Sequence, residues 1–137
     1  ATTLLGFGAS AIGQTPRGYV QNDADIRRWG TTIDSGEFAI AKGRETTPDD
    51  HMRRDIIERL MCDLAVDLDE VAKRHNADVT MFIPEMAKLT DMANDGIVTI
   101  GNNKIQVTET GRPFVRLVAA AFDAYLSQGK ARHSRAV

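Results

Sequence analysis

The sequence contains few residues of the kinds that mark secreted or membrane proteins. A single cysteine, Cys62, cannot form a disulfide within the chain, which favours a reducing, cytosolic setting. We expect no secretory leader and no membrane partner, because no apolar run is long enough to cross a bilayer. The formal net charge of -2 gives no long-range attraction to nucleic acid. The sequence therefore predicts a cytosolic protein whose partners are neither nucleic acids nor membranes.

The chain opens on an apolar stretch. Its length of 137 residues allows one compact core with outlying segments. The chain begins at Ala1, and the run from Leu4 to Ile12 is apolar without alternation, which is typical of a buried strand in a parallel sheet. No neighbouring parallel strand is evident in the sequence. We therefore expect a piece of a longer protein, with residues 1–22 forming a strand and a loop.

A short helix and a linker are expected next, in residues 23–46. Asn22 is a suitable N-cap, and Ile26, Trp29 and Ile33 recur on one helical face. Residues 37–46 have no clear hydrophobic period and contain a glycine, which indicates an extended linker.

Residues 47–128 carry the strongest helical pattern. Helix starts are expected at Thr47-Pro48 and at Asp67, and a third helix places Phe82 and Met86 on one face. Two short strands, 97–100 and 104–107, flank a turn, and a last helix follows Gly111. The predicted fold is mostly α with a small β-hairpin, in a winged-helix-like arrangement. Residues 129–137 are polar and basic, so we expect a disordered tail.

Single motifs give no catalytic residue and no metal site. The glycines of residues 6–11 match the dinucleotide fingerprint only formally, because Gly13, Pro16 and Gly18 prevent the helix that must follow. Cys62 falls on an apolar helical face, and the three histidines are too far apart for a local metal motif. The helix that would enter a DNA groove, residues 84–94, has more acidic than basic side chains.

Several separate segments resemble the C-terminal part of one family, the oxygen-independent coproporphyrinogen III oxidases. They occur in that family's order and cover almost the whole chain. The segments are residues 4–12, 19–22, 49–57, 60–62, 95–98, 111–112 and 122–126. The departures are confined to the linker, where Lys42-Gly43 replaces the usual Arg-Gly and Glu45-Thr46 replaces a more apolar pair.

The resemblance implies a radical S-adenosylmethionine enzyme of haem biosynthesis. Such enzymes convert two propionates of coproporphyrinogen III to vinyl groups, giving protoporphyrinogen IX, and hold a [4Fe-4S] cluster on a Cys-x-x-x-Cys-x-x-Cys loop. This chain has one cysteine and cannot bind the cluster, so we expect the chain alone to be inactive. Its expected partners are coproporphyrinogen III and the catalytic α/β barrel of the same polypeptide, whose last strand would lie in residues 1–22.

One cofactor-binding residue is implied by the resemblance. The isoleucine that ends the family's Gly-x-Ser-Ala-Ile stretch lies beside S-adenosylmethionine, and it corresponds to Ile12. The helical remainder would then cover the barrel mouth and help to enclose the substrate. Arg17, Arg53 and Arg54 are conceivable partners of the substrate's propionates, although solvated arginines are commoner.

Two alternatives stay open from the sequence. The related haem-chaperone branch of the same superfamily resembles Gly-x-Gly-x-Gly-Ala-His-Ser, whereas residues 6–12 contain no histidine. A winged-helix interaction module without enzymatic activity would leave the apolar opening run unexplained.

Overall fold

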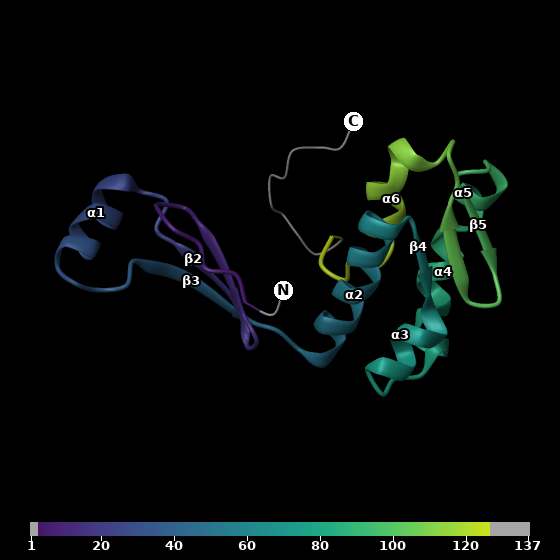
Figure 1. Ribbon diagram of the computed structural model, residues 1–137, viewed down its shortest axis with the longest axis horizontal. Coiled ribbons are helices and arrows are strands. Elements are labelled where there is room, and N and C mark those ends of the chain that lie inside the picture. The colour runs from purple at the N-terminus through teal and green to yellow at the C-terminus, as the bar shows by residue number, and fades with distance from the viewer. Residues whose placement is uncertain (1–2, 127–137) are drawn as a thin grey trace. The chain divides into compact units, whose positions relative to one another are not determined.

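The computed structural model describes residues 3–126, so the tail predicted for residues 129–137 lies outside the described residues. The chain divides into two compact units, Ala1–Thr47 and Pro48–Val137. Each unit contains a three-stranded antiparallel sheet (Figure 1). The fold therefore combines helices with two small sheets. The prediction of helices with a small β-hairpin is confirmed in part, because it did not include the sheet of the first unit.

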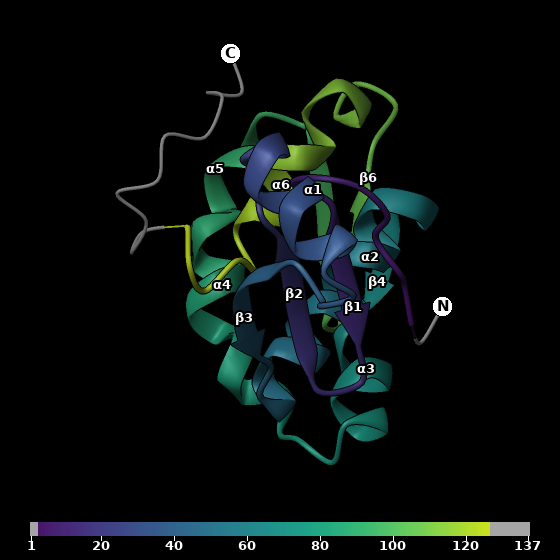
Figure 2. The ribbon, with the colours of Figure 1, turned by 90° about the vertical axis from the view of Figure 1, so that its left-hand side faces the viewer.

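The sheet of the first unit is formed by β1 (Ile12–Thr15), β2 (Gly18–Asn22) and β3 (Ile40–Glu45), in that order. Figure 2 looks onto these strands, with the helix α1 (Ile26–Asp34) at one end of the sheet. Gly18 is required where β2 meets β3, because a Cβ there would run into the carbonyl oxygen of Arg44.

The apolar opening run does not form the predicted strand. Leu4 makes an isolated antiparallel bridge to Gln14, and the chain then leaves the extended conformation at Gly8 and Ser10, whose φ angles are 95° and 62°. Phe7 is 89% exposed. Hydrophobicity without alternation predicts burial on both faces of a strand, but positive φ at two positions is incompatible with a continuous strand.

The next two expectations are corrected in detail. The predicted helix is present as α1, but its N-cap is Asp25, which accepts hydrogen bonds from the amides of Arg27 and Arg28. Asn22 ends β2 instead. Residues 40–45, expected to be linker, form β3 and pair with β2. All six residues of β3 are exposed, so the strand has no hydrophobic alternation from which it could be recognised.

The second unit contains most of the helices. Its elements are α2 (Pro48–Asp63), β4 (Ala65–Asp67), α3 (Leu68–Arg74), η1 (Val79–Phe82), α4 (Ile83–Lys88), α5 (Thr90–Asn94), β5 (Val98–Gly101), β6 (Lys104–Val107), η2 (Arg112–Phe114) and α6 (Val115–Ala120). The sheet order is β4-β6-β5. Among the helices of residues 3–126, none has the length and apolarity needed to cross a bilayer.

Local signals in the second unit are largely confirmed. Asp67 caps α3 by accepting from the amide of Glu70, and Gly96 follows α5 with φ 73°. The hairpin of β5 and β6 turns through Asn102 and Asn103, both with positive φ. The predicted third helix is divided into η1, α4 and α5, and the short strand β4 was not predicted.

The buried core lies almost entirely in the second unit. The sheet contributes Val66, Val98 and Ile105, and the helices add the rings of Phe82 and Phe122, which meet edge to face with centroids 6.0 Å apart. In the described part of the first unit, the single buried hydrophobic side chain is that of Ala39. The second unit therefore has a core of its own, whereas the described residues of the first unit form none.

Candidate functional site

Ile12, the predicted cofactor-binding residue, lies at the start of β1 and is 56% exposed. It is flanked by the glycine-containing segment of residues 6–10. Gly6 lies directly against it, because a Cβ on Gly6 would be 2.7 Å from the carbonyl oxygen of Ile12. A glycine is thus required for the backbone to approach Ile12 this closely.

Strand pairing places a defined set of side chains on the same sheet face as Ile12. Ile12 is opposite Gln21, which is opposite Lys42, and these three residues form one row across the sheet. The adjacent row on this face follows from the same register and the two-residue alternation of strands. That second row consists of Gln14, Tyr19 and Arg44.

A shallow hollow of about 520 Å³ lies at this part of the sheet. Its lining combines the apolar side chain of Ile12 and the ring of Tyr19 with the basic residues Lys42 and Arg44. We call this lining set the Ile12 hollow; its other members are Val20, Gln21 and Gly43. A flat, partly apolar ligand with an anionic group fits this combination of chemistry.

Two side chains of β2 hold the segment that leads to Ile12. The amide nitrogen of Asn22 donates to the carbonyl oxygen of Gly8 at 2.9 Å and to that of Gly6 at 3.5 Å. The amide nitrogen of Gln21 donates to the carbonyl oxygen of Ser10 at 3.3 Å. The carbonyl oxygens of three alternate residues of this segment therefore accept hydrogen bonds from side chains of β2. These bonds fix the path of the backbone beside Ile12.

The donor atoms of this chain suit an adenosyl group better than an iron–sulfur cluster. A [4Fe-4S] cluster requires several cysteine thiolates, and Cys62 stands alone and exposed. Within residues 3–126, no group of three or more histidine, cysteine, aspartate or glutamate side chains is arranged to hold a metal ion. The Ile12 hollow, by contrast, offers the apolar contact that an adenine requires.

Of the three arginines considered for the substrate's carboxylates, Arg53 is fully engaged within its own unit. Its guanidinium pairs with Asp49 at 2.7 Å and with Glu85 at 2.8 Å, and it lies over the ring of Phe82. Glu85 is only 8% exposed, so this ion pair is a buried link between α2 and α4. Arg54 is 4.0 Å from Glu58, and Arg17 lies exposed in the turn between β1 and β2. Arg53 and Arg54 thus belong to the second unit, and Arg17 belongs to the first.

A second charged cluster surrounds Asp55 on α2. Its carboxylate accepts from Arg59 and Arg74, each at 3.0 Å, and lies 3.2 Å from Nε2 of His75. Burial raises the pKa of Asp55, but the hydrogen bonds from Arg59 and His75 outweigh burial and hold that pKa below its usual value. Asp55 thus bonds to Arg74 in α3 and to His75, the C-cap of α3, and this cluster joins α2 to α3.

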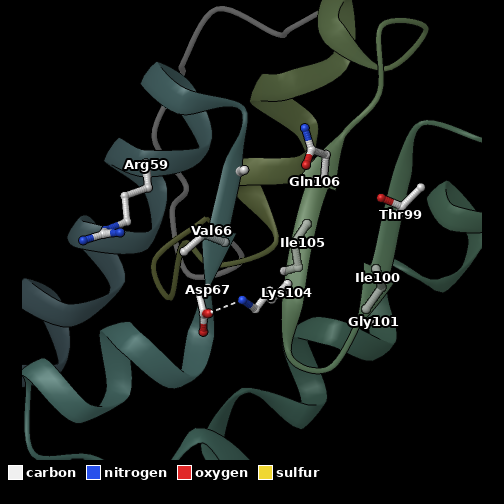
Figure 3. Close-up of a pocket in the computed structure, with 10 residues that line it drawn as sticks. Arg59, Val66, Asp67, Thr99, Ile100, Gly101, Lys104, Ile105 and Gln106 are labelled. Atoms are coloured by element: carbon white, nitrogen blue, oxygen red, sulfur yellow. Dashed lines mark ion pairs between the residues drawn. The ribbon is translucent and has the colours of Figure 1, made fainter.

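The exposed face of the second sheet forms another hollow, of about 540 Å³ (Figure 3). Lys104 on β6 points to Asp67 on β4, with 2.9 Å between the charged atoms. The hydrogen bond from Lys104 lowers the pKa of Asp67, and Asp67 raises that of Lys104. Arg59 at the rim pairs with Asp55 and Glu70. Each charged side chain that lines this hollow already has an ionic partner, which makes the hollow a weaker candidate than the Ile12 hollow.

Of the residues that line the Ile12 hollow, the sequence points to Ile12 alone as a binding residue. Lys42 and Arg44 fall in the segment predicted to be a linker. Alternate positions of a strand share one face, so these two residues would have been grouped with Tyr19 and Gln21 had β3 been recognised. No signal in the exposed strand β3 would have revealed its pairing with β2.

Comparisons with known proteins agree on one family. The family model described as the HemN C-terminal domain matches residues 46–114. The chain is 46% identical over 134 residues to the oxygen-independent coproporphyrinogen III oxidase of Bradyrhizobium diazoefficiens, covering 98% of this chain and 30% of that protein. It is 34% identical over 131 residues to the enzyme of the same name from Thermostichus vulcanus, covering 94% of this chain and 40% of that protein.

A solved structure is also similar. Coproporphyrinogen III oxidase (HemN) from Escherichia coli, described as a radical SAM enzyme, matches 90% of this chain and 29% of its own, with a TM-score of 0.84 and 32% identity. The chain thus spans less than half the length of each of these three proteins.

Proposed function

Because the chain belongs to the HemN C-terminal domain family, we propose that it forms the C-terminal part of an oxygen-independent coproporphyrinogen III oxidase. The observation that carries this proposal is the similarity to enzymes of that name along nearly the whole chain. Each reaction of such an enzyme converts a propionate to a vinyl group by loss of one hydrogen atom, one electron and carbon dioxide. Two propionates of coproporphyrinogen III react, which yields protoporphyrinogen IX.

The first unit, in this proposal, packs against a catalytic barrel, with residues 1–22 next to the barrel and residues 23–46 leading away from it. Its exposed apolar side chains support this role. Leu5, Phe7, Ile26 and Phe38 are all more than half exposed, and burying such groups against another domain is favourable.

The second unit is proposed to be a winged-helix-like domain that covers the substrate site. Helices α2, α3 and α4 with the β5–β6 hairpin are consistent with that arrangement. The domain has its own hydrophobic core, so it can act as a rigid cover. Within the whole enzyme, the [4Fe-4S] cluster and S-adenosylmethionine would supply the radical that takes the hydrogen atom. We propose a cytoplasmic location, where thiolate ligands stay reduced.

Ile12 is proposed to contact S-adenosylmethionine, with Asn22 and Gln21 holding the backbone beside it. Ile12→Asp would place a charge against an apolar contact, and we expect the dissociation constant of S-adenosylmethionine to rise at least tenfold. Ile12→Val is the matched control and should bind nearly as the wild type does. An unchanged dissociation constant for Ile12→Asp, measured by equilibrium dialysis on the intact enzyme, would refute the contact.

The activity is tested on the complete polypeptide that contains this chain, prepared without oxygen and with its cluster restored. With S-adenosylmethionine and an electron donor, it should convert coproporphyrinogen III to protoporphyrinogen IX. The products are oxidised to porphyrins and measured by chromatography. Removing residues 46–137 should abolish conversion while cluster absorbance is retained. A complete polypeptide that carries the cluster and leaves coproporphyrinogen III unchanged would contradict the proposed function.

A further inference from the structure

Tyr19 is a feature of the Ile12 hollow that the assigned cofactor contact does not use. It lies on β2, in the cross-strand row next to that of Ile12 and on the same face of the sheet. Among the described residues that line the hollow, Tyr19 is the single aromatic one, and it is only partly buried. The hollow therefore presents an aromatic ring to a ligand beside the apolar side chain of Ile12.

The strand register sets the spacing between Ile12 and Tyr19. Ile12 is opposite Gln21, and Tyr19 lies two positions before Gln21 on β2, so Ile12 and Tyr19 are diagonal neighbours. Diagonal neighbours on one face of an antiparallel pair lie about 7–8 Å apart. Carbon atoms pack at about 3.5–4 Å, so a flat ring with a side chain on each of its sides needs about 7–8 Å. The two side chains are therefore spaced to contact both sides of one flat ring.

The side chain of Gln21 leaves this space open. Its amide nitrogen donates to the carbonyl oxygen of Ser10 at 3.3 Å. Ser10 in turn donates its backbone amide to the carbonyl oxygen of Asp23, so it lies beyond Gln21 on the side opposite to Tyr19. The bond thus directs the end of the Gln21 side chain away from Tyr19. This direction agrees with a hollow that includes both Ile12 and Tyr19.

Resting on the proposed function, we propose that Tyr19 is a second contact residue for the adenine of S-adenosylmethionine, with its ring on the side of the adenine opposite Ile12. Adenine is flat and aromatic, and an aromatic side chain gains from stacking on such a ring beyond the area that it buries. The porphyrinogen is a poorer fit, because four saturated carbons join its pyrrole rings and prevent the macrocycle from being flat. The spacing of Ile12 and Tyr19 therefore selects the cofactor over the substrate.

The test uses the complete enzyme with the substitution Tyr19→Leu, which keeps a large apolar side chain and removes the ring. The probes are S-adenosylmethionine and adenosine, which has the adenine without the methionine, and equilibrium dialysis measures the binding of both. We expect each dissociation constant to rise about fivefold. Tyr19→Phe keeps the ring and should bind both probes within about twofold of the wild type.

Two controls separate a ring contact from a general loss of structure. Phe38→Leu removes another ring of the first unit, which is 89% exposed and does not line the hollow, and it should bind both probes as the wild type does. At saturating S-adenosylmethionine, Tyr19→Leu should also keep the KM for coproporphyrinogen III within about twofold of the wild-type value.

Three results would overturn the inference. Unchanged binding of S-adenosylmethionine by Tyr19→Leu would show that the ring makes no contact with the cofactor. An equal loss of binding in Tyr19→Phe would assign the contact to the hydroxyl group. A raised KM for coproporphyrinogen III would place Tyr19 at the substrate. If the wild-type enzyme converts coproporphyrinogen III, each of these results overturns the inference alone, whereas a wild type that neither binds S-adenosylmethionine nor converts the porphyrinogen overturns the proposed function with it.

Discussion

The two units of this chain bury their hydrophobic residues very differently. The second unit encloses a continuous core of aliphatic and aromatic side chains drawn from its sheet and helices. The first unit has a regular sheet and a well-capped helix, yet Ala39 is its single buried hydrophobic side chain among the described residues. Hydrogen-bonded strands are therefore present in both units, whereas hydrophobic stabilisation is concentrated in one.

The comparison shows that regular secondary structure does not imply independent stability. A net hydrogen bond contributes about 1 kcal/mol, while ordering the backbone costs about 1–2 kcal/mol per residue. Burial of apolar area has to supply the difference. The second unit can meet that requirement from its own side chains. The first unit requires another surface against its exposed apolar residues, which is the role that the proposed function gives to the barrel.

The largest expected difference appears when the units are separated. Residues 46–137 alone should unfold cooperatively in urea, because their core is complete within the piece. Residues 1–47 alone should lack cooperative unfolding and show little ordered sheet by circular dichroism. The two pieces, prepared and measured in the same buffer, make the comparison directly.

A cooperative transition in residues 1–47 as a dilute monomer would break the contrast between the units. Folding of that piece that depends on its concentration would not contradict the contrast, because self-association can cover the exposed apolar residues. Sedimentation at two concentrations distinguishes these cases.

A pair of phenylalanine substitutions tests the same contrast within the intact chain. Phe82 is completely buried against Phe122, whereas Phe38 in the first unit is 89% exposed. Phe82→Ala should lower the free energy of unfolding of the second unit by about 3–5 kcal/mol. Phe38→Ala should change it by less than about 0.5 kcal/mol. Urea titrations give both values, and equal effects would show that exposure in this chain does not report on stability.

The same contrast explains what could be predicted from the sequence. Some signals act through adjacent backbone groups, namely Asp67, Gly96 and the Asn102-Asn103 turn. The ends of helices and strands that these residues mark were therefore predicted correctly. Each helix of the second unit buries one face, so the apolar residues recur in the sequence at the helical period. By contrast, β3 is exposed along its whole length and its pairing with β2 joins residues 18 to 27 positions apart, so no local pattern indicates it.

The candidate site was affected by the same limitation. Ile12 was identified because a family motif ends on it. Lys42 came to the same face only through two strand pairings, and the hydrogen bonds from Asn22 to Gly6 and Gly8 span 14 to 16 residues. Such contacts depend on the tertiary structure, and the local periodicity of the sequence does not indicate them.

Glycine substitutions should have smaller effects, which depend on the space at each position and not on the unit alone. A Cβ on Gly111 would run into the carbonyl oxygen of Ile97, whereas one on Gly43 would find its nearest atom, the carbonyl oxygen of Tyr19, at 3.8 Å. Gly111→Ala should therefore cost about 1–3 kcal/mol of unfolding free energy, because backbone must move to relieve the overlap. Gly43→Ala should be neutral within about 0.5 kcal/mol. Thermal unfolding of both variants beside the wild type measures the effects, and a neutral Gly111→Ala would mean that the turn after β6 yields easily.

The smallest expected effect concerns charge, and it depends on pH. The pKa of Asp55 in the second unit is below its usual value, because hydrogen bonds from Arg59 and His75 outweigh burial, which acts in the opposite direction. The unfolded chain therefore takes up the proton first on acidification, and the stabilisation is present above about pH 4 and is lost as pH falls through the folded-state pKa. Asp55→Asn should cost about 1–2 kcal/mol at pH 7, with the difference from wild type shrinking towards pH 3 in urea titrations.

Asp23 supplies the matched control from the first unit. A hydrogen bond from Arg28 also lowers the pKa of Asp23, so the two carboxylates resemble each other in their local chemistry. Asp23→Asn should nevertheless leave the unfolding of the second unit unchanged at every pH, since Asp23 lies in the other unit, whose described residues form no hydrophobic core. If Asp23→Asn and Asp55→Asn shifted that transition alike, the units would unfold as one, and the stabilities of the coreless sheet and the packed domain would have to be treated as coupled.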